Sequence, residues 1–385
     1  MKGEKSNMNF VTESSPHIRR RATAYGMMAD VLIALIPVIL FSIGYGWWGV
    51  RNIIFPVLAM EIAEFCFVLI RNKGSFKERV KAYSPLNALT SAISGIIFGL
   101  MLPATNGPMM YFYLIIGALF GIIIGKLVFG GTGSNIFNPA AVAFVFTQIC
   151  FGSSISSMGN FGDGAVHNFW IDMIFKSADV NTGATLLSSS SIFASPTPYT
   201  NISLLDLLLG NTAGAMGEVC KLAILIGLVY LLVRRAADWR VVAGFALTFI
   251  VLTFIAGLFV TYKGHAVDNP FLFVAYMLLS GGVLYGMTYM ITDPVTMPID
   301  APARVSYGML IAVFALFMRF FAANPEGVVY AILIMNAVAT FLDYAKWSHS
   351  QFNKKDIIVY VCIAAVAILV ICLGVNSKID AFQAK

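Results

Sequence analysis

The sequence FGGTGSNIFNPAAVAFVF occupies residues 129–146 and joins two apolar stretches through a glycine-rich turn. Its three glycines let the backbone turn tightly and approach a ligand closely. Asn135 and Asn138 stand three residues apart at the beginning of the second stretch, where the N–H groups of a helix lack partners. Pro139 suits a first helical turn. The stretch predicts a broken helix that holds a polar ligand; the alternative is an ordinary loop with an asparagine cap.

The composition places this turn in a membrane. The chain has 385 residues, of which 59% are hydrophobic and 11% charged, and its mean hydropathy is +0.82. Soluble domains contain about 25% charged residues. Eleven apolar stretches are candidate transmembrane spans. They are Tyr25–Trp48, Ile53–Ile70, Asn87–Leu102, Met110–Phe129, Ile136–Phe151, Met216–Val233, Val241–Tyr262, Phe271–Ile291, Val305–Phe321, Val328–Phe341 and Ile357–Leu373.

The pattern around the glycine-rich turn recurs in the second half of the chain. LMLPATNGP (100–108) precedes an apolar stretch and the GGTG turn, and TDPVTMP (292–298) precedes an apolar stretch and AANPEG (322–327). Each half has five spans. Because this number is odd, the two halves have opposite orientations in the membrane and form an inverted repeat. Glycine- and proline-broken elements at matching places in inverted halves indicate a site near the membrane midplane. We predict an all-α integral membrane protein of about ten transmembrane helices in two inverted five-helix repeats, plus an extra C-terminal helix.

Basic residues predict the orientation, because cytoplasmic loops are rich in Lys and Arg. The segments HIRRR, RNKGSFKERVK, RRAADWR and KWSHSQFNKKD all fall on the cytoplasmic side if the N-terminus lies there. The net charge of +6 therefore concerns topology and not nucleic acid. The resulting division is a cytoplasmic tail (1–24), a first repeat (25–151), an outer-face loop (152–215), a second repeat (216–345), and a basic loop with the extra helix (346–385).

Charged residues within spans are functional candidates, because they are costly in hydrocarbon. Glu61 and Glu64 lie three apart on one helix face and predict a cation path or a protein partner, with an interior salt bridge as the alternative. Charges near span ends are expected to reach out to the membrane surface. These are Lys126, Glu218, Lys221 and Arg319. The five cysteines form no CxxC pair and the four histidines are scattered, so we predict no metal site.

Two further polar stretches are candidates. TDPVTMP contains two prolines, which exclude a continuous helix, and its Asp293 can cap a turn; a rigid turn is the alternative. TGAT (182–185) carries hydroxyls on Thr182 and Thr185 around the small residues Gly183 and Ala184. A hydroxyl can be esterified by a phosphate. Taken alone, this tetrapeptide is a common loop sequence.

Together the motifs resemble a known family. SSPHI, KLVFGGTGSNIFNPA, TGATLLS, GNTAGAMGE, TDPVTMP and NPEGVVYAILIMN occur in this order between Ser14 and about Trp347. The sequence resembles the family of the D subunits of Rnf complexes and, more distantly, the B subunits of Na⁺-translocating NADH:quinone oxidoreductases. The short tail before the first span is similar to that of the Rnf subunits.

The resemblance implies two flavins and a urea-transporter-like fold. In this family the residue matching Thr185 carries FMN through a phosphoester made by a separate flavin transferase. A second, non-covalent riboflavin lies towards the cytoplasmic side in the quinone-reductase relative. The candidate cofactor contacts are Thr182, Gly183 and Ala184 beside Thr185, Asn324 and Glu326 of the outer NPEG turn, and Gly131, Asn135, Asn138 and Asp293 towards the cytoplasm.

The resemblance also implies a place in a complex of the bacterial inner membrane. Such a complex couples electron flow between ferredoxin and NAD⁺ to Na⁺ or H⁺ movement. Its expected partners are the covalent-FMN G subunit, the NADH- and FMN-binding C subunit, and the membrane A and E subunits. The chain has no GxGxxG nicotinamide fingerprint, so NAD is expected on a partner. The alternatives are a small-solute channel or transporter of urea-transporter-like fold without a redox role, and a structural scaffold.

Overall fold

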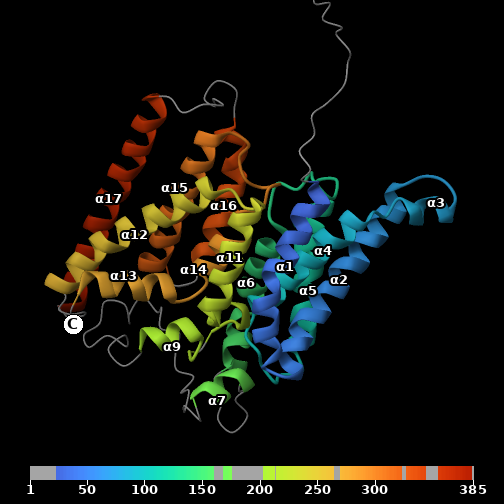
Figure 1. The fold of residues 1–385 in the computed structure, drawn as a ribbon, viewed down its shortest axis with the longest axis horizontal. Helices are drawn as coiled ribbons and strands as arrows, with labels where there is room; N and C mark the ends of the chain where they lie inside the picture. Colours follow the sequence, from blue (N-terminus) through green and yellow to red (C-terminus); the bar gives the residue numbers. More distant parts are fainter. Residues whose placement is uncertain are drawn as a thin grey trace, which may run out of the picture.

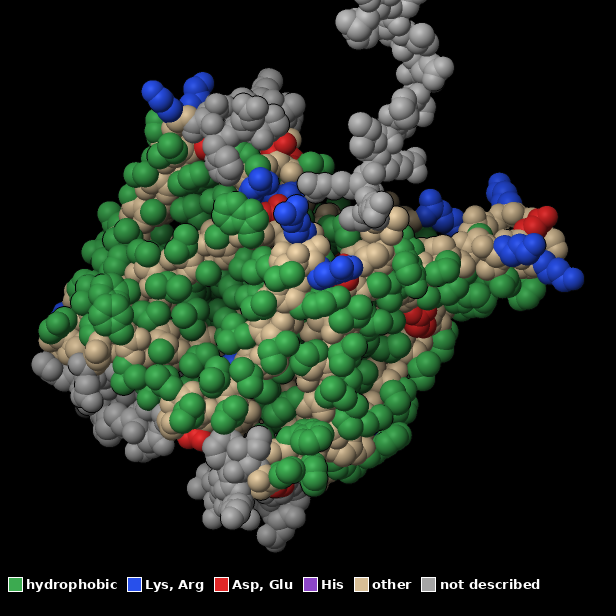
Figure 2. Space-filling model, in the orientation of Figure 1, with side chains coloured by type: hydrophobic (Ala, Val, Ile, Leu, Met, Phe, Trp, Pro, Cys, Tyr) green, Lys and Arg blue, Asp and Glu red, His purple; other side chains and the backbone are tan. Residues whose placement is uncertain are grey.

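The protein is all-α in the part that its computed structural model describes, residues 23–159, 168–175, 203–212, 214–263, 269–322, 327–343 and 354–383. Seven of these helices are long and apolar enough to cross a membrane, and a bent pair raises the number to eight. This confirms the prediction of an all-α integral membrane protein. Apolar side chains cover most of the face in Figure 2, as a lipid-facing surface requires.

The first repeat lies between the N-terminal tail and the long loop. Its elements are α1 (Ala24–Ile43), α2 (Trp47–Arg71), the short α3 (Phe76–Lys81), α4 (Pro85–Leu100), α5 (Met110–Ile122) with the π-helical turn η1 (Ile123–Leu127), and α6 (Pro139–Gly159). Two small helices follow in the described parts of the loop region, namely α7 (Phe169–Phe175) and α9 (Leu204–Leu209).

The second repeat follows α9. Its elements are α10 (Met216–Val219), α11 (Lys221–Arg234), α12 (Trp239–Tyr262), α13 (Pro270–Leu279), α14 (Val283–Tyr289), α15 (Ala301–Phe321) and α16 (Gly327–Leu342). The extra helix α17 (Lys354–Gln383) packs outside the repeat, against α12 and α15.

The packing of the two halves matches element by element. In the first half α2 packs on α4 and α5, α5 on α6, and α1 on α4. In the second half α12 packs on α13 and α15, α15 on α16, and α11 on α14. The halves meet where α1 contacts α11 and where α6 contacts α16. Figure 1 shows α3 at the right-hand end of the molecule, in the upper half of the view, and α7 and α9 at the lower edge.

Several predicted spans are shorter or more broken than the sequence suggested. The helices α4, α11 and α16 have 16, 14 and 16 residues, whereas crossing the hydrocarbon core takes about 20. The predicted span Phe271–Ile291 is present as a bent pair of helices, α13 and α14, with an angle of 57° between them. Its break lies at Ser280–Gly282, where Gly281 has a φ of +60°. The expected span Met216–Val233 is likewise divided, between α10 and α11.

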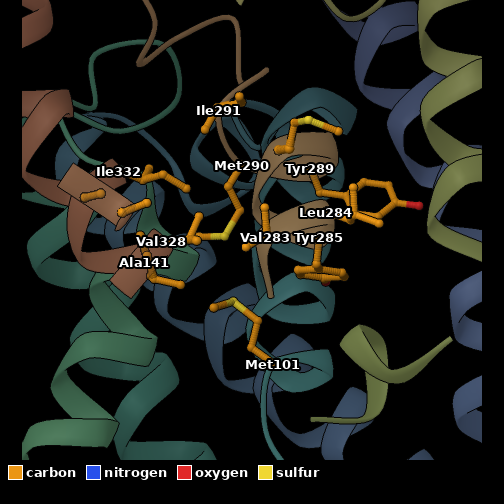
Figure 3. Packing of buried hydrophobic residues seen from close by; sticks show 14 of the residues in the cluster. Met101, Ala141, Val283, Leu284, Tyr285, Tyr289, Met290, Ile291, Val328 and Ile332 are labelled. Atoms are coloured by element: carbon orange, nitrogen blue, oxygen red, sulfur yellow. The ribbon is translucent and has the colours of Figure 1, made fainter. Parts of the chain in front are cut away.

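The interior core lies where the halves meet. Figure 3 shows side chains of α14 packed beside Val328 and Ile332 of α16, with Ala141 and Met101 below them. Two tyrosines of α14 also cross to the first repeat. The hydroxyl of Tyr285 donates to the carbonyl of Ile97 at 3.2 Å, and that of Tyr289 donates to the carbonyl of Ala34 at 2.9 Å. These contacts hold the broken span in the centre of the molecule.

The helix α4 approaches α2 through two glycines. Gly95 and Gly99 are four residues apart, which is the spacing that lets membrane helices pack closely. A Cβ atom at Gly99 would lie 1.9 Å from the carbonyl oxygen of Asn52, and one at Gly95 would lie 2.7 Å from the Cα of Val57. Only glycine therefore fits at these two positions.

We predict that Gly99→Ala destabilises the protein by about 1–3 kcal/mol, since the added methyl group forces two backbones apart. Equilibrium unfolding in mixed detergent micelles measures this change. Gly152→Ala in α6 is the matched control, because its new Cβ would meet only the flexible side chain of Gln148, at 3.3 Å. Equal stabilities of the two variants would contradict the close approach of α4 and α2.

Candidate functional site

A cavity of about 60 Å³ lies where the two repeats meet. Its wall combines side chains of α1 and α4, the turn η1, the glycine-rich loop before α6, and the end of α14 with the turn that follows it. The lining residues are Met28, Val31, Thr90, Ile93, Ser94, Ile97, Lys126, Thr132, Gly133, Asn135, Asn138, Pro139, Tyr289, Thr292, Asp293, Pro294 and Val295. One part of the wall is apolar and the other carries amides, hydroxyls and charges.

The glycine-rich loop adopts a conformation that needs its glycines. Gly130, Gly131 and Gly133 have φ values of +116°, +93° and +86°, in the region that L side chains avoid. The guanidinium of Arg71, at the end of α2, donates to the carbonyl of Gly130. Gly131 is not part of the cavity wall and lies against the ring of Phe67.

Both asparagines of the loop are buried and line the cavity. The Oδ1 of Asn138 accepts from the backbone N–H of Ala140 at 3.0 Å, so this residue also caps α6. The Nδ2 of Asn135 donates to the carbonyl of Phe137 at 3.2 Å. The amides therefore combine a structural role in the loop with a place at the cavity.

Asp293 reaches the same cavity from the second repeat. Its Oδ1 accepts from the N–H of Val295 at 3.2 Å, and its Oδ2 accepts from the hydroxyl of Thr296 at 3.2 Å. The carboxylate thus fixes the turn after α14, as expected for an Asp that caps a turn. The fold brings Asn135, Asn138 and Asp293 together, although more than 150 residues separate the loop from the turn.

A buried ion pair adjoins the cavity. The Nζ of Lys126 in η1 lies 2.8 Å from the Oε2 of Glu64 in α2, and the two side chains are 3% and 1% exposed. The π-helical turn positions the lysine, with the N–H of Val128 donating to the carbonyl of Ile123 five residues earlier. Such turns are rare and occur frequently at functional sites.

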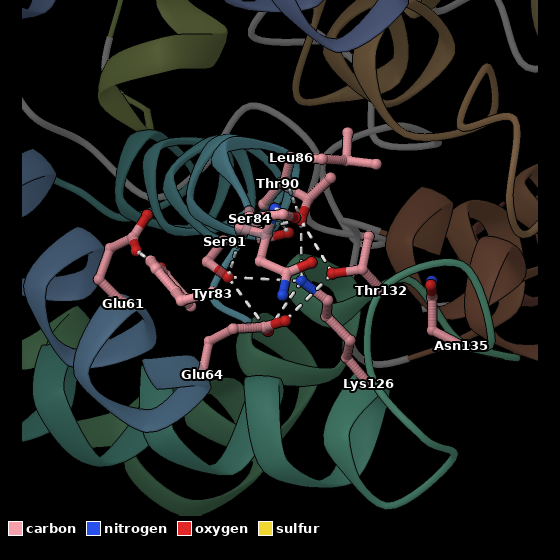
Figure 4. Close-up of polar contacts among 12 residues, drawn as sticks. Glu61, Glu64, Tyr83, Ser84, Leu86, Thr90, Ser91, Lys126, Thr132 and Asn135 are labelled. Carbon is pink, nitrogen blue, oxygen red and sulfur yellow. Dashed lines mark hydrogen bonds and ion pairs between the residues drawn. The ribbon is translucent and has the colours of Figure 1, made fainter. Parts of the chain in front are cut away.

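Three hydroxyls surround this pair (Figure 4). Ser91 donates to the Oε2 of Glu64 at 3.1 Å, and Thr132 donates to its Oε1 at 3.0 Å. Lys126 donates to the hydroxyl of Thr90 at 2.9 Å. Because Thr90, Thr132 and Lys126 also line the cavity, the hydrogen-bond network connects the cavity to Glu64.

Glu61 and Glu64 do not form one acidic pair. Glu61 accepts a hydrogen bond from the hydroxyl of Tyr83, whereas Glu64 is paired with Lys126. Figure 4 shows the two carboxylates directed to different partners. The interior salt bridge left open by the sequence is present at Glu64.

The expectation that the charges near span ends reach out to the membrane surface is wrong. Glu218, Lys221 and Arg319 are 3%, 3% and 1% exposed, like Lys126. Arg319 donates to the carbonyls of Met277 at 2.6 Å and Ser280 at 3.1 Å, and Lys221 donates to that of Gly281 at 2.8 Å. These cations bind the carbonyls that the break between α13 and α14 leaves without helical partners.

Lys126 is the site residue that sequence reasoning missed. Its position just before the GGTG turn was the available signal, but the π-helical turn that directs it inward has no sequence pattern of its own. The predicted contacts Thr182, Gly183, Ala184, Thr185, Asn324 and Glu326 lie outside the described residues.

Comparison with known proteins finds relatives over most of the chain. The model of the family described as NQR2, RnfD, RnfE matches residues 11–351. The chain is 28% identical to the D subunit of the ion-translocating oxidoreductase complex of Alcanivorax borkumensis, over 91% of this chain and 98% of that protein. It is 26% identical to the D subunit of the Na⁺-translocating ferredoxin:NAD⁺ oxidoreductase complex of Acetobacterium woodii, over 91% of this chain and 96% of that protein.

A third relative is more similar over a shorter segment. The B subunit of the Na⁺-translocating NADH-quinone reductase of Chromohalobacter salexigens is 33% identical over 255 residues, which are 66% of this chain and 57% of that protein. The chain thus spans little more than half of the quinone-reductase relative. Since the family match runs through both repeats and the loop between them, the chain belongs to the NQR2, RnfD, RnfE family.

Proposed function

We propose that this chain is a membrane electron-transfer subunit of an Rnf-type complex that couples electron flow between ferredoxin and NAD⁺ to Na⁺ or H⁺ translocation. It carries FMN on Thr185 and holds riboflavin in the cavity between the repeats. The observation that carries the proposal is the amphipathic cavity, which has Asn135, Asn138 and Asp293 in its wall and adjoins the buried pair of Glu64 and Lys126.

The chemistry of the wall fits a flavin ring. That ring has a polar edge of carbonyl and N–H groups and an apolar edge, and the wall offers the amides of Asn135 and Asn138 and the carboxylate of Asp293 together with apolar side chains of α1 and α4. About 60 Å³ of free space holds a few water molecules. A flavin ring therefore enters only if flexible wall side chains such as Met28 shift. A bound flavin supplies the electron-transfer chemistry, and the protein orients and tunes it.

The covalent FMN is proposed from the sequence alone. In TGAT, Thr185 follows two small residues that leave room for a bulky group, and its hydroxyl can form a phosphoester with FMN. Thr182, Gly183 and Ala184 are its neighbours, and Asn324 and Glu326 are the proposed outer contacts. Riboflavin towards the cytoplasmic side and FMN on the outer face would give an electron path across the membrane.

The Rnf-type assignment is favoured by coverage, because the chain matches 98% and 96% of the two D subunits. The proposed partners are the G, C, A and E subunits and a flavin transferase for maturation, with NAD bound elsewhere in the complex. The proposed location is the bacterial inner membrane. Figure 2 shows Lys and Arg side chains over α3 and over the beginning of α17, which supports a cytoplasmic side at that edge and the TGAT loop outside.

We predict that Thr185→Ala abolishes covalent flavin, because no other group replaces the esterified hydroxyl. The measurement is ultraviolet fluorescence of the denatured band after co-expression with a flavin transferase, with the mass of the Thr185 peptide as confirmation. Ser188→Ala, three residues further on, is the control and should stay fluorescent. A dark band from the unmodified sequence would favour the channel or transporter function instead.

We predict that Asn135→Ala weakens retention of the non-covalent flavin by about 0.5–1.5 kcal/mol, roughly 2- to 12-fold in affinity, through loss of one hydrogen bond. Acid extraction and chromatography of the released riboflavin measure occupancy. Ser134→Ala in the exposed part of the same loop is the matched control. Unchanged riboflavin in Asn135→Ala would remove this residue from the site.

We propose Glu64 and Glu61 as part of the cation path, since both carboxylates lie on the membrane helix α2. The double change Glu61→Gln and Glu64→Gln should lower the ions moved per electron several-fold in proteoliposomes while electron transfer continues. Glu64→Gln alone should account for most of the loss, because Glu64 adjoins the cavity network. Glu78→Gln on the exposed α3 is the control. Unchanged coupling in the double variant would exclude this path.

A further inference from the structure

Four described cations near breaks in the membrane helices donate to backbone carbonyls. Arg51 donates to the carbonyl of Thr105, and Arg71 to that of Gly130. Lys221 and Arg319 donate to carbonyls at the break between α13 and α14. Lys126 pairs with the carboxylate of Glu64, and its other hydrogen bonds go to the hydroxyls of Thr90 and Ser91. Donation to backbone carbonyls therefore does not explain the position of its ammonium.

Lys126 lies between the cavity and the buried carboxylate of Glu64. Its side chain is part of the cavity wall, and its Nζ pairs with Glu64 behind that wall. The Nζ also donates to Thr90, whose side chain lines the cavity. Small rotations of a long, unbranched side chain are enough to move the ammonium from Glu64 towards the cavity. The π-helical turn η1 places it at this junction.

We propose that Lys126 is a built-in cation that occupies Glu64 in the resting protein and leaves it when negative charge enters the cavity. This inference rests on the proposed function, because it names how that site would couple charge to ion uptake. The ammonium then faces the cavity, and a Na⁺ or H⁺ from water takes its place at Glu64. One negative charge enters and one positive charge follows, so the interior keeps its net charge.

Electrostatics allow one cation at a time beside Glu64, either the ammonium of Lys126 or the incoming Na⁺ or H⁺. A carboxylate that is 1% exposed cannot remain without a counter-charge, and removing one partner of a buried pair is strongly destabilising. A second cation beside Lys126 would be repelled by the ammonium at close range. The hydroxyls of Ser91 and Thr132 stay on Glu64 in either state and provide oxygen ligands for a small hard cation.

The first test needs no flavin and uses the purified full-length chain. Lys126→Met removes the charge and keeps an unbranched side chain. We expect the Tm of this variant to rise with NaCl relative to choline chloride at equal ionic strength, or to rise as the pH is lowered if the ion is H⁺. The unchanged chain should show neither response, since Lys126 already satisfies Glu64.

Three controls make this result specific. The double variant Glu64→Gln with Lys126→Met should lose both responses. Because both of its substituted side chains are neutral, this variant should fold even if the single variant does not. Lys126→Arg should behave like the unchanged chain. Lys77→Met on the exposed α3 removes a charge elsewhere. The proposal would be overturned if the Tm of Lys126→Met changed with neither Na⁺ nor pH. It would also be overturned if the Tm of the double variant changed by the same amount as that of Lys126→Met.

The second test uses the flavin-loaded complex and its redox titration. The midpoint potential of the non-covalent flavin should rise with Na⁺ concentration, or with falling pH, in the unchanged protein. Lys126→Met should lose this dependence, because Glu64 then holds its cation in both redox states. The same dependence in both proteins would overturn the exchange. Absence of any non-covalent flavin would count against the proposed function, while the thermal test still decides the role of Lys126.

Discussion

The structure depends on one constraint, that lipid offers no hydrogen-bond partner to a backbone carbonyl. A helix that breaks inside the membrane exposes carbonyls, and the protein must supply donors for them. Arg319 and Lys221 do so at the break between α13 and α14, and Arg51 and Asn52 do so in the segment after α4. Three buried cations of this apolar chain, Arg51, Lys221 and Arg319, thus serve its broken helices.

The fold was largely predictable because hydropathy and the order of motifs are properties of the sequence. The spans at α1, α2, α12 and α15 have strong apolar patterns and appear as expected. Helices in the interior were harder to predict. The span Phe271–Ile291 bends at the run Ser280-Gly281-Gly282, a turn signal, whereas the single Gly257 stays helical within α12. The sequence thus marks a candidate break, but the 57° bend is known only from the structure.

The candidate site was predictable in its residue types but not in its connections. Asn135 and Asn138 were identified by their position after the glycine-rich turn at the start of a helix, and Asp293 by its position in the proline-broken TDPVTMP stretch. Their meeting in one cavity depends on the contact between repeats, which no local pattern records. The partner of Glu64 was harder still. A lysine near the end of a span ordinarily extends to the surface, and only the π-helical turn and the carboxylate on α2 draw Lys126 inward.

The matching position in the second half holds a buried cation with different partners. Helices α2 and α12 occupy matching positions, as do α5 with η1 and α15, and both second elements present a buried cation near their ends. On α2 that cation meets Glu64, but α12 has no acidic residue, and Arg319 binds carbonyls of the α13–α14 break. The two halves are therefore similar in helix packing at these positions but differ in the printed partner of the buried cation, a carboxylate for Lys126 and backbone carbonyls for Arg319. A cation that donates to the carbonyls at a helix break cannot leave without depriving those carbonyls of their hydrogen-bond donor. A cation that pairs with a carboxylate can be replaced by another cation.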